Sequence, residues 1–194
     1  MATYSDVIDS AEARARPILG EVCAQIADVQ VRNRGTLGGN VCMSDPTNHL
    51  PPLLVALEAT FTVAGTAGTR WVAAEDFFLG VYMTAVGSGE LLTKVSLPAG
   101  KNDGFASVAI GADGTCIVSA AASQNGGGPR IAIGCVDAVP VLVEPGSTDA
   151  DTVRQAVRDA ELNPPDDVHA SADYRRHLAE VLAVRAVEQA VKGR

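Results

Sequence analysis

The spacing of apolar side chains along the chain predicts several helices. Apolar residues recur at intervals of three and four after Pro17, which predicts a helix over Pro17–Ala27. Proline is typical of the first turn of a helix, and two prolines follow Leu50 at the start of a further predicted helix. Ser171 is a typical capping residue at the start of the last helix. The other helical segments that the pattern predicts are a frayed helix at Met1–Arg16, helices at Leu50–Ala59 and Thr152–Leu162, a last helix from near Ser171, and a short helix or turn at Ala74–Leu79.

Short apolar runs bounded by glycine, proline and asparagine predict the strands. Gly114 and the run Gly126–Gly128 are expected to form turns between the three long strands that follow residue 104. The polar and glycine-containing stretch Ala99–Gly104 predicts a boundary between two domains, at 1–99 and 104–194. The expected strands are Asn40–Met43, Thr60–Ala64, Thr69–Ala73 and Glu90–Leu97 in the first domain, and Phe105–Ile110, Cys116–Ser123, Pro129–Val136 and Val141–Glu144 in the second.

Glycine is concentrated in one segment, Val31–Asn40, where three glycines lie within five residues. Glycine lets other groups approach the backbone closely, and successive bare N–H groups can form an anion-binding hollow. Thr36 and Asn40 add side-chain donors. The spacing is that of neither a dinucleotide-binding G-x-G-x-x-G loop nor a P-loop. Composition alone therefore favours a tight structural turn.

The order of residues points further than the composition does. Arg-Asn-x-Gly-Thr-Leu-Gly-Gly-Asn over 32–40, with Asp45-Pro46 and Leu50-Pro51-Pro52 after it, resembles the FAD-binding medium subunit of the molybdenum hydroxylases. That family includes aerobic carbon monoxide dehydrogenase and xanthine dehydrogenase. Further resemblance lies at Phe77–Gly80, Gly89–Thr93, Leu97-Pro98, Arg130–Gly134 and Ser171–His177, so that it extends from about Pro17 to Val191.

The resemblance implies an α+β fold with a partial PCMH-type FAD-binding lobe over 1–99. Residues 104–194 would form a domain like the C-terminal domain of the carbon monoxide dehydrogenase flavoprotein, with a three-stranded antiparallel sheet and C-terminal helices. The implied function is to bind FAD and pass electrons from the [2Fe–2S] clusters of a small subunit to an acceptor such as NAD⁺. The substrate would be oxidised at a molybdenum cofactor in a separate large subunit.

Site residues follow from the resemblance position by position. It implies that Thr36, Gly38, Gly39 and Asn40 contact FAD, that Arg32, Asn33 and Gly35 shape the loop, that Ser44 and Asp45 border the ribityl–phosphate region, and that Leu92 lies near the isoalloxazine ring.

The sequence departs from the family pattern at three places. Family subunits open with a lobe carrying an Ala-Gly-Gly-x-Ser-Leu loop that grips the pyrophosphate, and no such stretch precedes Pro17. His49 stands where the family usually has Asp or Glu. The strand after Phe105, which in the family usually carries Lys and Arg that reach the flavin, has no basic residue over Ala106–Asp113.

These departures predict weakened FAD binding by the isolated chain and leave two interpretations open. In one, a further chain supplies the missing lobe. In the other, the protein is a flavin-free relative that serves as an assembly module or as a non-redox enzyme in the vacated cleft. His49 is then a candidate general acid or base. A surface or packing role is the simpler interpretation of His49.

Composition excludes other classes of function. The net charge of −8 and the absence of a basic cluster argue against nucleic-acid binding. Acidic residues occupy the place of a signal-peptide core, and the apolar run Leu53–Ala64 is too short to span a bilayer and contains Glu58. A cytoplasmic protein is expected. The four cysteines form no C-x-x-C motif, which predicts small buried apolar residues and no metal site.

Overall fold

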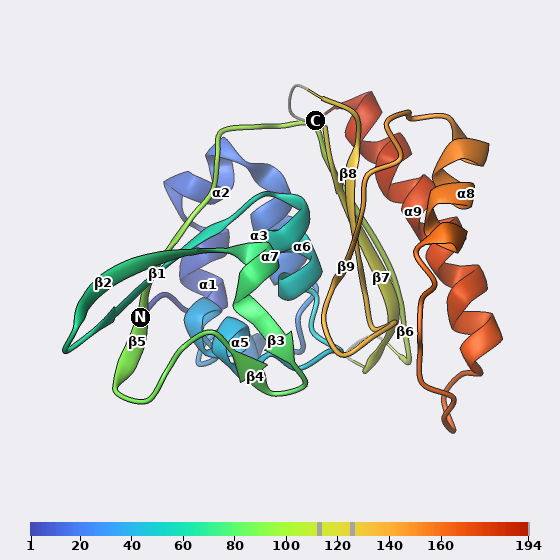
Figure 1. Cartoon of the computed structure of the whole chain (residues 1–194). Coiled ribbons are helices and arrows are strands. Elements are labelled where there is room, and N and C mark those ends of the chain that lie inside the picture. Colours follow the sequence, from blue (N-terminus) through green and yellow to red (C-terminus); the bar gives the residue numbers. More distant parts are fainter. Residues whose placement is uncertain (112–113, 125–126, 194) are drawn as a thin grey trace.

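A computed structural model describes residues 1–111, 114–124 and 127–193 of the chain. Figure 1 shows two lobes side by side, a first lobe of short helices and small sheets and a second lobe built on a larger sheet. Ala112 and Asp113 of the stretch without basic residues, and Gly126 of the predicted glycine turn, lie outside the described part of the chain.

The first lobe packs short helices against a three-stranded antiparallel sheet of order β2-β1-β5 and a small β3–β4 hairpin. The strand predictions for this sheet are confirmed within one residue at each end. The helices are α1 (Tyr4–Ile8), α2 (Ala11–Ala15), α3 (Pro17–Ala24), α4 (Val29–Arg32), α5 (Leu37–Met43), α6 (Leu50–Ala56) and α7 (Ala74–Phe77); the strands are β1 (Thr60–Gly65), β2 (Gly68–Ala73), β3 (Phe78–Gly80), β4 (Met83–Thr84) and β5 (Glu90–Ser96).

Two predictions for this lobe are wrong in detail. The N-terminal segment forms two capped helices instead of one frayed helix, because the Thr3 and Ser10 side chains each accept a hydrogen bond from a first-turn amide. The strand predicted at Asn40–Met43 is part of helix α5. An apolar run of that length has no periodicity that separates helix from strand, and the preceding cap decides the outcome.

The second lobe is a four-stranded antiparallel sheet of order β6-β7-β8-β9 with two helices on its outer face (Figure 1). It contains the three expected strands, and the short strand predicted at Val141–Glu144 pairs with β8 as a fourth. The elements are β6 (Asp103–Ala109), β7 (Cys116–Ser123), β8 (Arg130–Gly134), β9 (Val141–Val143), α8 (Ala150–Asp159) and α9 (Ala172–Lys192). Ser171 caps α9, as the sequence predicts.

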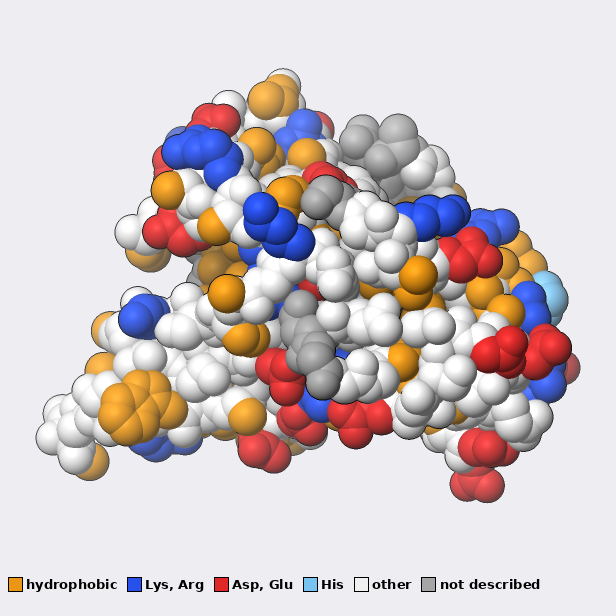
Figure 2. All heavy atoms as spheres, turned by 90° about the horizontal axis from the view of Figure 1, so that it is seen from above, with side chains coloured by type: hydrophobic (Ala, Val, Ile, Leu, Met, Phe, Trp, Pro, Cys, Tyr) orange, Lys and Arg blue, Asp and Glu red, His pale blue; other side chains and the backbone are white. Residues whose placement is uncertain are grey.

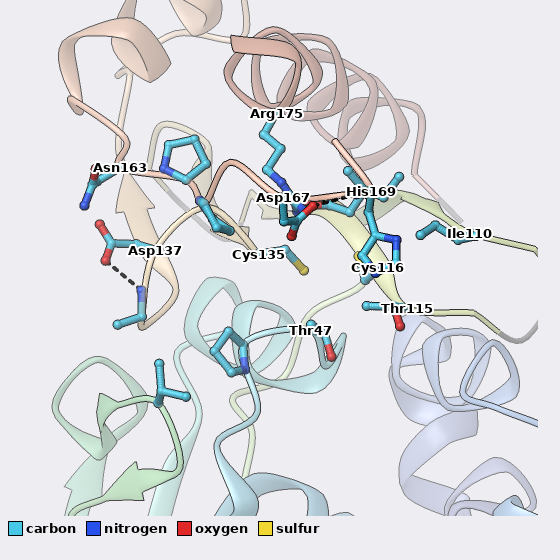
Figure 3. A pocket seen from close by; sticks show the side chains of 16 residues that line it. Thr47, Ile110, Thr115, Cys116, Cys135, Asp137, Asn163, Asp167, His169 and Arg175 are labelled. Carbon is cyan, nitrogen blue, oxygen red and sulfur yellow. Dashed lines mark hydrogen bonds and ion pairs between the residues drawn. The ribbon is translucent and has the colours of Figure 1, made fainter. Parts of the chain in front are cut away.

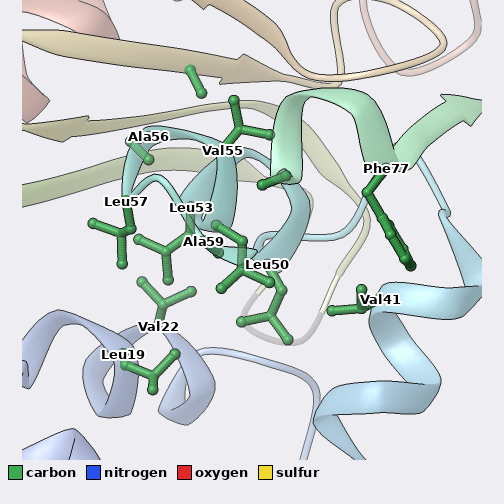
Figure 4. Packing of buried hydrophobic residues seen from close by; sticks show 14 of the residues in the cluster. Leu19, Val22, Val41, Leu50, Leu53, Val55, Ala56, Leu57, Ala59 and Phe77 are labelled. Carbon is green, nitrogen blue, oxygen red and sulfur yellow. The ribbon is translucent and has the colours of Figure 1, made fainter. Parts of the chain in front are cut away.

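Helix α6 connects the hydrophobic cores of the lobes. All seven of its residues are buried, and it packs on the inner face of β7 and β8 as well as on the helices of its own lobe. Figure 4 shows the side chains of this cluster, including Leu50, Leu53 and Phe77. The same cluster includes Phe105, Ala121 and Ala132 of the second lobe. A second cluster fills the space between the sheet and helices α8 and α9.

On the face that Figure 2 shows, acidic and basic side chains are interspersed, without a broad basic patch. Among the described residues, no helix combines the length and apolar character needed to cross a membrane. The same part of the chain holds no group of three His, Cys, Asp or Glu side chains that could bind a metal ion.

Candidate functional site

The glycine-rich segment starts helix α5. Thr36 precedes the helix, and its Oγ1 accepts a hydrogen bond of 3.0 Å from the Gly39 amide. The amide of Leu37 donates to the carbonyl oxygen of Ala2, and the amide of Asn40 donates to that of Thr36, both at 3.0 Å. The expectation that the bare amides of this segment face a ligand is therefore wrong for Leu37, Gly39 and Asn40.

Arg32, Asn33 and Gly35 hold the segment in place. The Arg32 guanidinium donates to main-chain oxygens of the turn before α4, and Asn33 Oδ1 accepts a 2.6 Å hydrogen bond from the Ser5 hydroxyl. A Cβ atom on Gly35 would lie 2.7 Å from the Tyr4 ring, so only glycine fits beneath helix α1 at this position. These three residues fix the segment against the N-terminal helices.

Gly38 has open space beside it, and Asn40 has a side-chain oxygen without a hydrogen-bond partner in the described structure. A Cβ atom added to Gly38 would meet no atom within 4 Å, so neither packing nor the glycine's conformation accounts for the small residue here. Asn40 Oδ1 is buried and has no hydrogen-bond partner in the described structure. Burial raises the pKa of Tyr4, and a hydrogen bond with the Asn40 side chain partly offsets that rise. An unpaired buried acceptor destabilises a protein, which makes Oδ1 a candidate ligand contact.

Ser44 and Asp45 are used by the local structure at the other end of α5. Ser44 has a left-handed conformation with φ of 48°, and its hydroxyl donates to the Gly80 carbonyl oxygen at 3.0 Å. Asp45 Oδ1 accepts hydrogen bonds of 2.8 Å from both the amide and the hydroxyl of Thr47. Both residues shape the turn between α5 and α6, and Ser44 also fastens it to the β3–β4 hairpin.

Leu92 lies on the strand beside helix α5. It is half-buried in β5, opposite Val63 of β1, and packs on the main core of the first lobe. Helix α5 packs directly against β5. The structure therefore brings the strand of Leu92 and the helix of Gly38 and Asn40 together, whereas Ser44 and Asp45 lie beyond the last turn of that helix.

His49 packs at the contact between the lobes. Its ring centroid is 5.2 Å from that of Phe105, with the ring planes inclined by 59°, and its buried Nδ1 has no hydrogen-bond partner in the described structure. It also approaches the thiol of Cys116 in the second lobe. These neighbours are far from His49 in the sequence, and no local pattern could have indicated them.

Family models match both parts of the chain. Residues 1–100 match the FAD binding domain in molybdopterin dehydrogenase. Residues 106–190 match the CO dehydrogenase flavoprotein C-terminal domain. The two matches together span nearly the whole chain.

Curated relatives and solved structures agree with these matches. The carbon monoxide dehydrogenase medium chain of Hydrogenophaga pseudoflava is 32% identical over 98% of this chain and 72% of the relative. Reconstituted CO dehydrogenase from Oligotropha carboxidovorans aligns with a TM-score of 0.87 at 32% identity, over 97% of this chain and 72% of that chain. Quinoline 2-oxidoreductase from Pseudomonas putida 86 aligns with a TM-score of 0.86 at 34% identity, over 99% and 73%. The chain belongs to the FAD-binding medium subunits of the molybdenum hydroxylases.

Proposed function

We propose that the start of helix α5, together with β5, forms the part of the flavin site that this chain supplies. In that site Gly38 and Asn40 contact FAD, and Leu92 provides an apolar surface beside it. FAD, when bound, supplies the capacity to accept and release electrons one or two at a time. The role of the chain's own residues is to bind the cofactor, orient it and keep water away from it.

The observation that carries this proposal is the unpaired, buried Oδ1 of Asn40 next to the open space at Gly38. The ribityl hydroxyls and the ring N–H of a flavin are hydrogen-bond donors, which is the chemistry that an orphaned carbonyl oxygen requires. The missing side chain at Gly38 leaves room for a ligand to approach the helix. The unpaired acceptor and the open space of the site thus fit FAD.

Thr36 adds a second polar contact. Its Oγ1 accepts the Gly39 amide, and the hydroxyl proton remains able to donate to an oxygen of the cofactor. Arg32, Asn33 and Gly35 act indirectly, because their contacts are with the protein and fix the position of the segment. Ser44 and Asp45 act in the same indirect way at the far end of the helix.

The partners follow from the relatives, which are named as medium chains or medium subunits. A medium chain implies companion chains, and we assign a large chain with the molybdenum cofactor and a small chain with [2Fe–2S] clusters. In the proposed complex, electrons pass from the clusters through FAD to an acceptor such as NAD⁺, in the cytoplasm. Residues 1–99 carry the flavin contacts, and 104–194 form the second domain against which helix α6 packs.

A flavin-binding measurement tests this proposal. The purified chain, and the complex that co-purifies with it, are each mixed with FAD, desalted and examined by visible absorption and flavin fluorescence. Retained flavin with shifted visible bands is the expected result, in a ratio near one per chain in the complex. Loss of all flavin from both samples, with circular dichroism showing folded protein, would contradict the proposal.

A further inference from the structure

A β-bulge brings Cys116 to the inner face of the second sheet. Val108 pairs with Val118, so regular pairing would place Ala109 opposite Ile117, but Ala109 pairs with Cys116 instead. Side chains alternate between the faces of a strand, and one extra residue moves the side chains beyond it to the other face. Cys116 consequently shares the face of Ser119, which contacts its sulfur.

The bulge places Cys116 beside a second cysteine. Cys135 follows β8 with a left-handed φ of 66°, and its thiol lies near the Cys116 thiol, whose sulfur donates to the Val108 carbonyl oxygen at 3.7 Å. Figure 3 shows the two side chains next to one another at one wall of a cavity. The Ser119 hydroxyl is fully buried near both cysteines and has no hydrogen-bond partner in the described structure.

Groups that favour a thiolate surround the pair. Arg175 of α9 is buried; it donates from Nη1 to the Ile117 carbonyl oxygen in the bulge at 2.6 Å and pairs through Nη2 with Asp167 at 2.8 Å. The neighbouring Cys135 thiol lowers the pKa of Cys116 to about 6, against the opposing effect of burial and with help from His49. The neighbouring Cys116 thiol and burial raise the pKa of Cys135, so Cys116 is the more acidic of the two thiols.

Cys116 and Cys135 both line a cavity, although the two residues are almost completely buried. Its volume is about 480 Å³, and the two cysteines line it together with the 46–47 turn, the loop that follows β8 and the segment before α9. Its charged and titratable wall residues are Asp137, Asp167, His169 and Arg175. A thiol that is covered by its neighbours on one side therefore faces a space that a small reagent can enter (Figure 3).

We propose that Cys116 and Cys135 form a redox-active thiol pair that a small-molecule disulfide entering this cavity oxidises to an intramolecular disulfide. In the first step the Cys116 thiolate attacks one sulfur of the disulfide, which forms a mixed disulfide and releases one thiolate. In the second step the Cys135 sulfur attacks the Cys116 sulfur, its proton passes to the thiolate already released, and the second thiolate leaves to take a proton from solvent. The pair thus gives up two electrons, which reduce the disulfide to two thiols. The inference does not depend on the proposed flavin site.

The other two cysteines provide internal controls. Cys23 is fully buried, and burial raises its pKa to about 12; burial also raises the pKa of the half-buried Cys42. Cys23 and Cys42 do not line the cavity that Cys116 and Cys135 share, and burial is the only cause of the shift in the pKa of each. Ordinary buried thiols of this kind are inert, whereas a thiolate next to cationic groups reacts.

Alkylation of the unaltered full-length chain is the first test. Iodoacetamide is applied at pH 7 and each cysteine is followed by peptide mass mapping. We expect Cys116 to react about tenfold faster than the more exposed Cys42, with a pH midpoint near 6 set mainly by Cys135 and His49 beside it. Faster reaction of Cys42, or a Cys116 midpoint at or above the usual thiol value, would overturn the proposal.

Oxidised glutathione provides the second test. By intact-protein mass spectrometry, the unaltered chain and the control Cys42→Ser should lose two hydrogens and carry no adduct. Cys135→Ser should retain one glutathione on Cys116, and Cys116→Ser should show neither product. An unchanged mass of the unaltered chain, or an adduct carried by Cys42, would overturn the proposal. Circular dichroism checks the folding of each variant, and the unaltered chain decides the question if a variant does not fold.

Discussion

Arg16 and Asp103 join the two lobes through a bidentate ion pair that is almost completely buried. Arg16 Nε lies 2.8 Å from Asp103 Oδ2, Arg16 Nη2 lies 2.8 Å from Oδ1, and the side chains are 4% and 1% exposed. The guanidinium also donates to the Pro98 carbonyl oxygen and the Ser123 hydroxyl. The residue between α2 and α3 is thereby bound to the first residue of β6, and both hydrogen bonds of the ion pair are buried.

Removing one partner of this pair should destabilise the chain strongly. Arg16→Met leaves the Asp103 carboxylate buried without its cation, a change that costs about 3–5 kcal/mol of unfolding free energy. Urea denaturation measures the loss. Arg154→Met is the matched control, since Arg154 pairs with an exposed Asp151 and exposed pairs contribute about 0–1 kcal/mol. The double variant Arg16→Met with Asp103→Leu should recover part of the loss; equal effects of the Arg16 and Arg154 variants would contradict the assignment.

Gly104 should not tolerate even alanine. A Cβ atom there would lie 1.9 Å from the main-chain oxygen of Ala186, so β6 approaches helix α9 too closely for any side chain. Gly104→Ala should lower the unfolding free energy by about 1–3 kcal/mol or more, because neither backbone can yield without disturbing the core. Thermal denaturation provides the measurement, and an unchanged melting temperature would show that the two elements move apart easily.

Gly38→Ala separates the flavin site from the stability of the fold. The added methyl group meets no atom within 4 Å, and alanine is a better helix former than glycine by about 1 kcal/mol. We therefore expect unchanged or higher thermal stability together with FAD binding weakened about tenfold, measured by flavin fluorescence titration. Stability that changes while the FAD affinity does not would place the ligand elsewhere.

Asn40→Ala tests the orphaned oxygen itself. The variant removes an unpaired acceptor together with the side chain's hydrogen bond to Tyr4, so it should cost the free chain about 0.5–1.5 kcal/mol. The loss of one hydrogen bond to FAD, about 0.5–1.5 kcal/mol, should raise the dissociation constant up to about tenfold. A large loss of stability with unaltered FAD affinity would instead assign Asn40 a structural role beside Tyr4.

Glu90 should make the fold sensitive to acid. Its carboxylate accepts hydrogen bonds from Arg70 and from the Gly87 amide, which lower its pKa from 4.5 to about 2. Because the pKa is lower in the folded chain, the ionised pair stabilises the fold above pH 4.5, and this contribution is lost as the pH falls toward 2. Glu90→Gln should therefore lose less stability than the unaltered chain across that window in urea titrations. Parallel pH profiles of the two proteins would contradict this.

The sequence predicted the elements whose signals are local. Strands β1 and β2 are bounded by a glycine turn, and Ser171 marks the start of α9 with an ordinary cap. Helix α5 was missed because adjacent glycines usually interrupt helices, whereas here the Thr36 side chain caps one. The residue order of the glycine-rich segment carried the family resemblance, which the comparisons confirm.

Contacts between the lobes could not be predicted in the same way. The cysteines were expected to be buried apolar residues, and three of them are buried, but the bulge that turns Cys116 toward Cys135 has no sequence signal of its own. The tilted contact between the His49 and Phe105 rings likewise depends on how two separately predicted units pack. Sequence periodicity describes each element by itself, and chemistry that arises where elements meet requires the fold.

Helix α6 has a consequence for how the chain can be divided. Leu50 to Ala56 are buried between the helices of the first lobe and the sheet of the second, so cutting the chain at the 99–104 linker would leave an exposed apolar surface on each fragment. We therefore expect neither half to fold on its own, although each matches its own family model. Because the two lobes share a core, we expect a single cooperative unfolding transition on calorimetric heating.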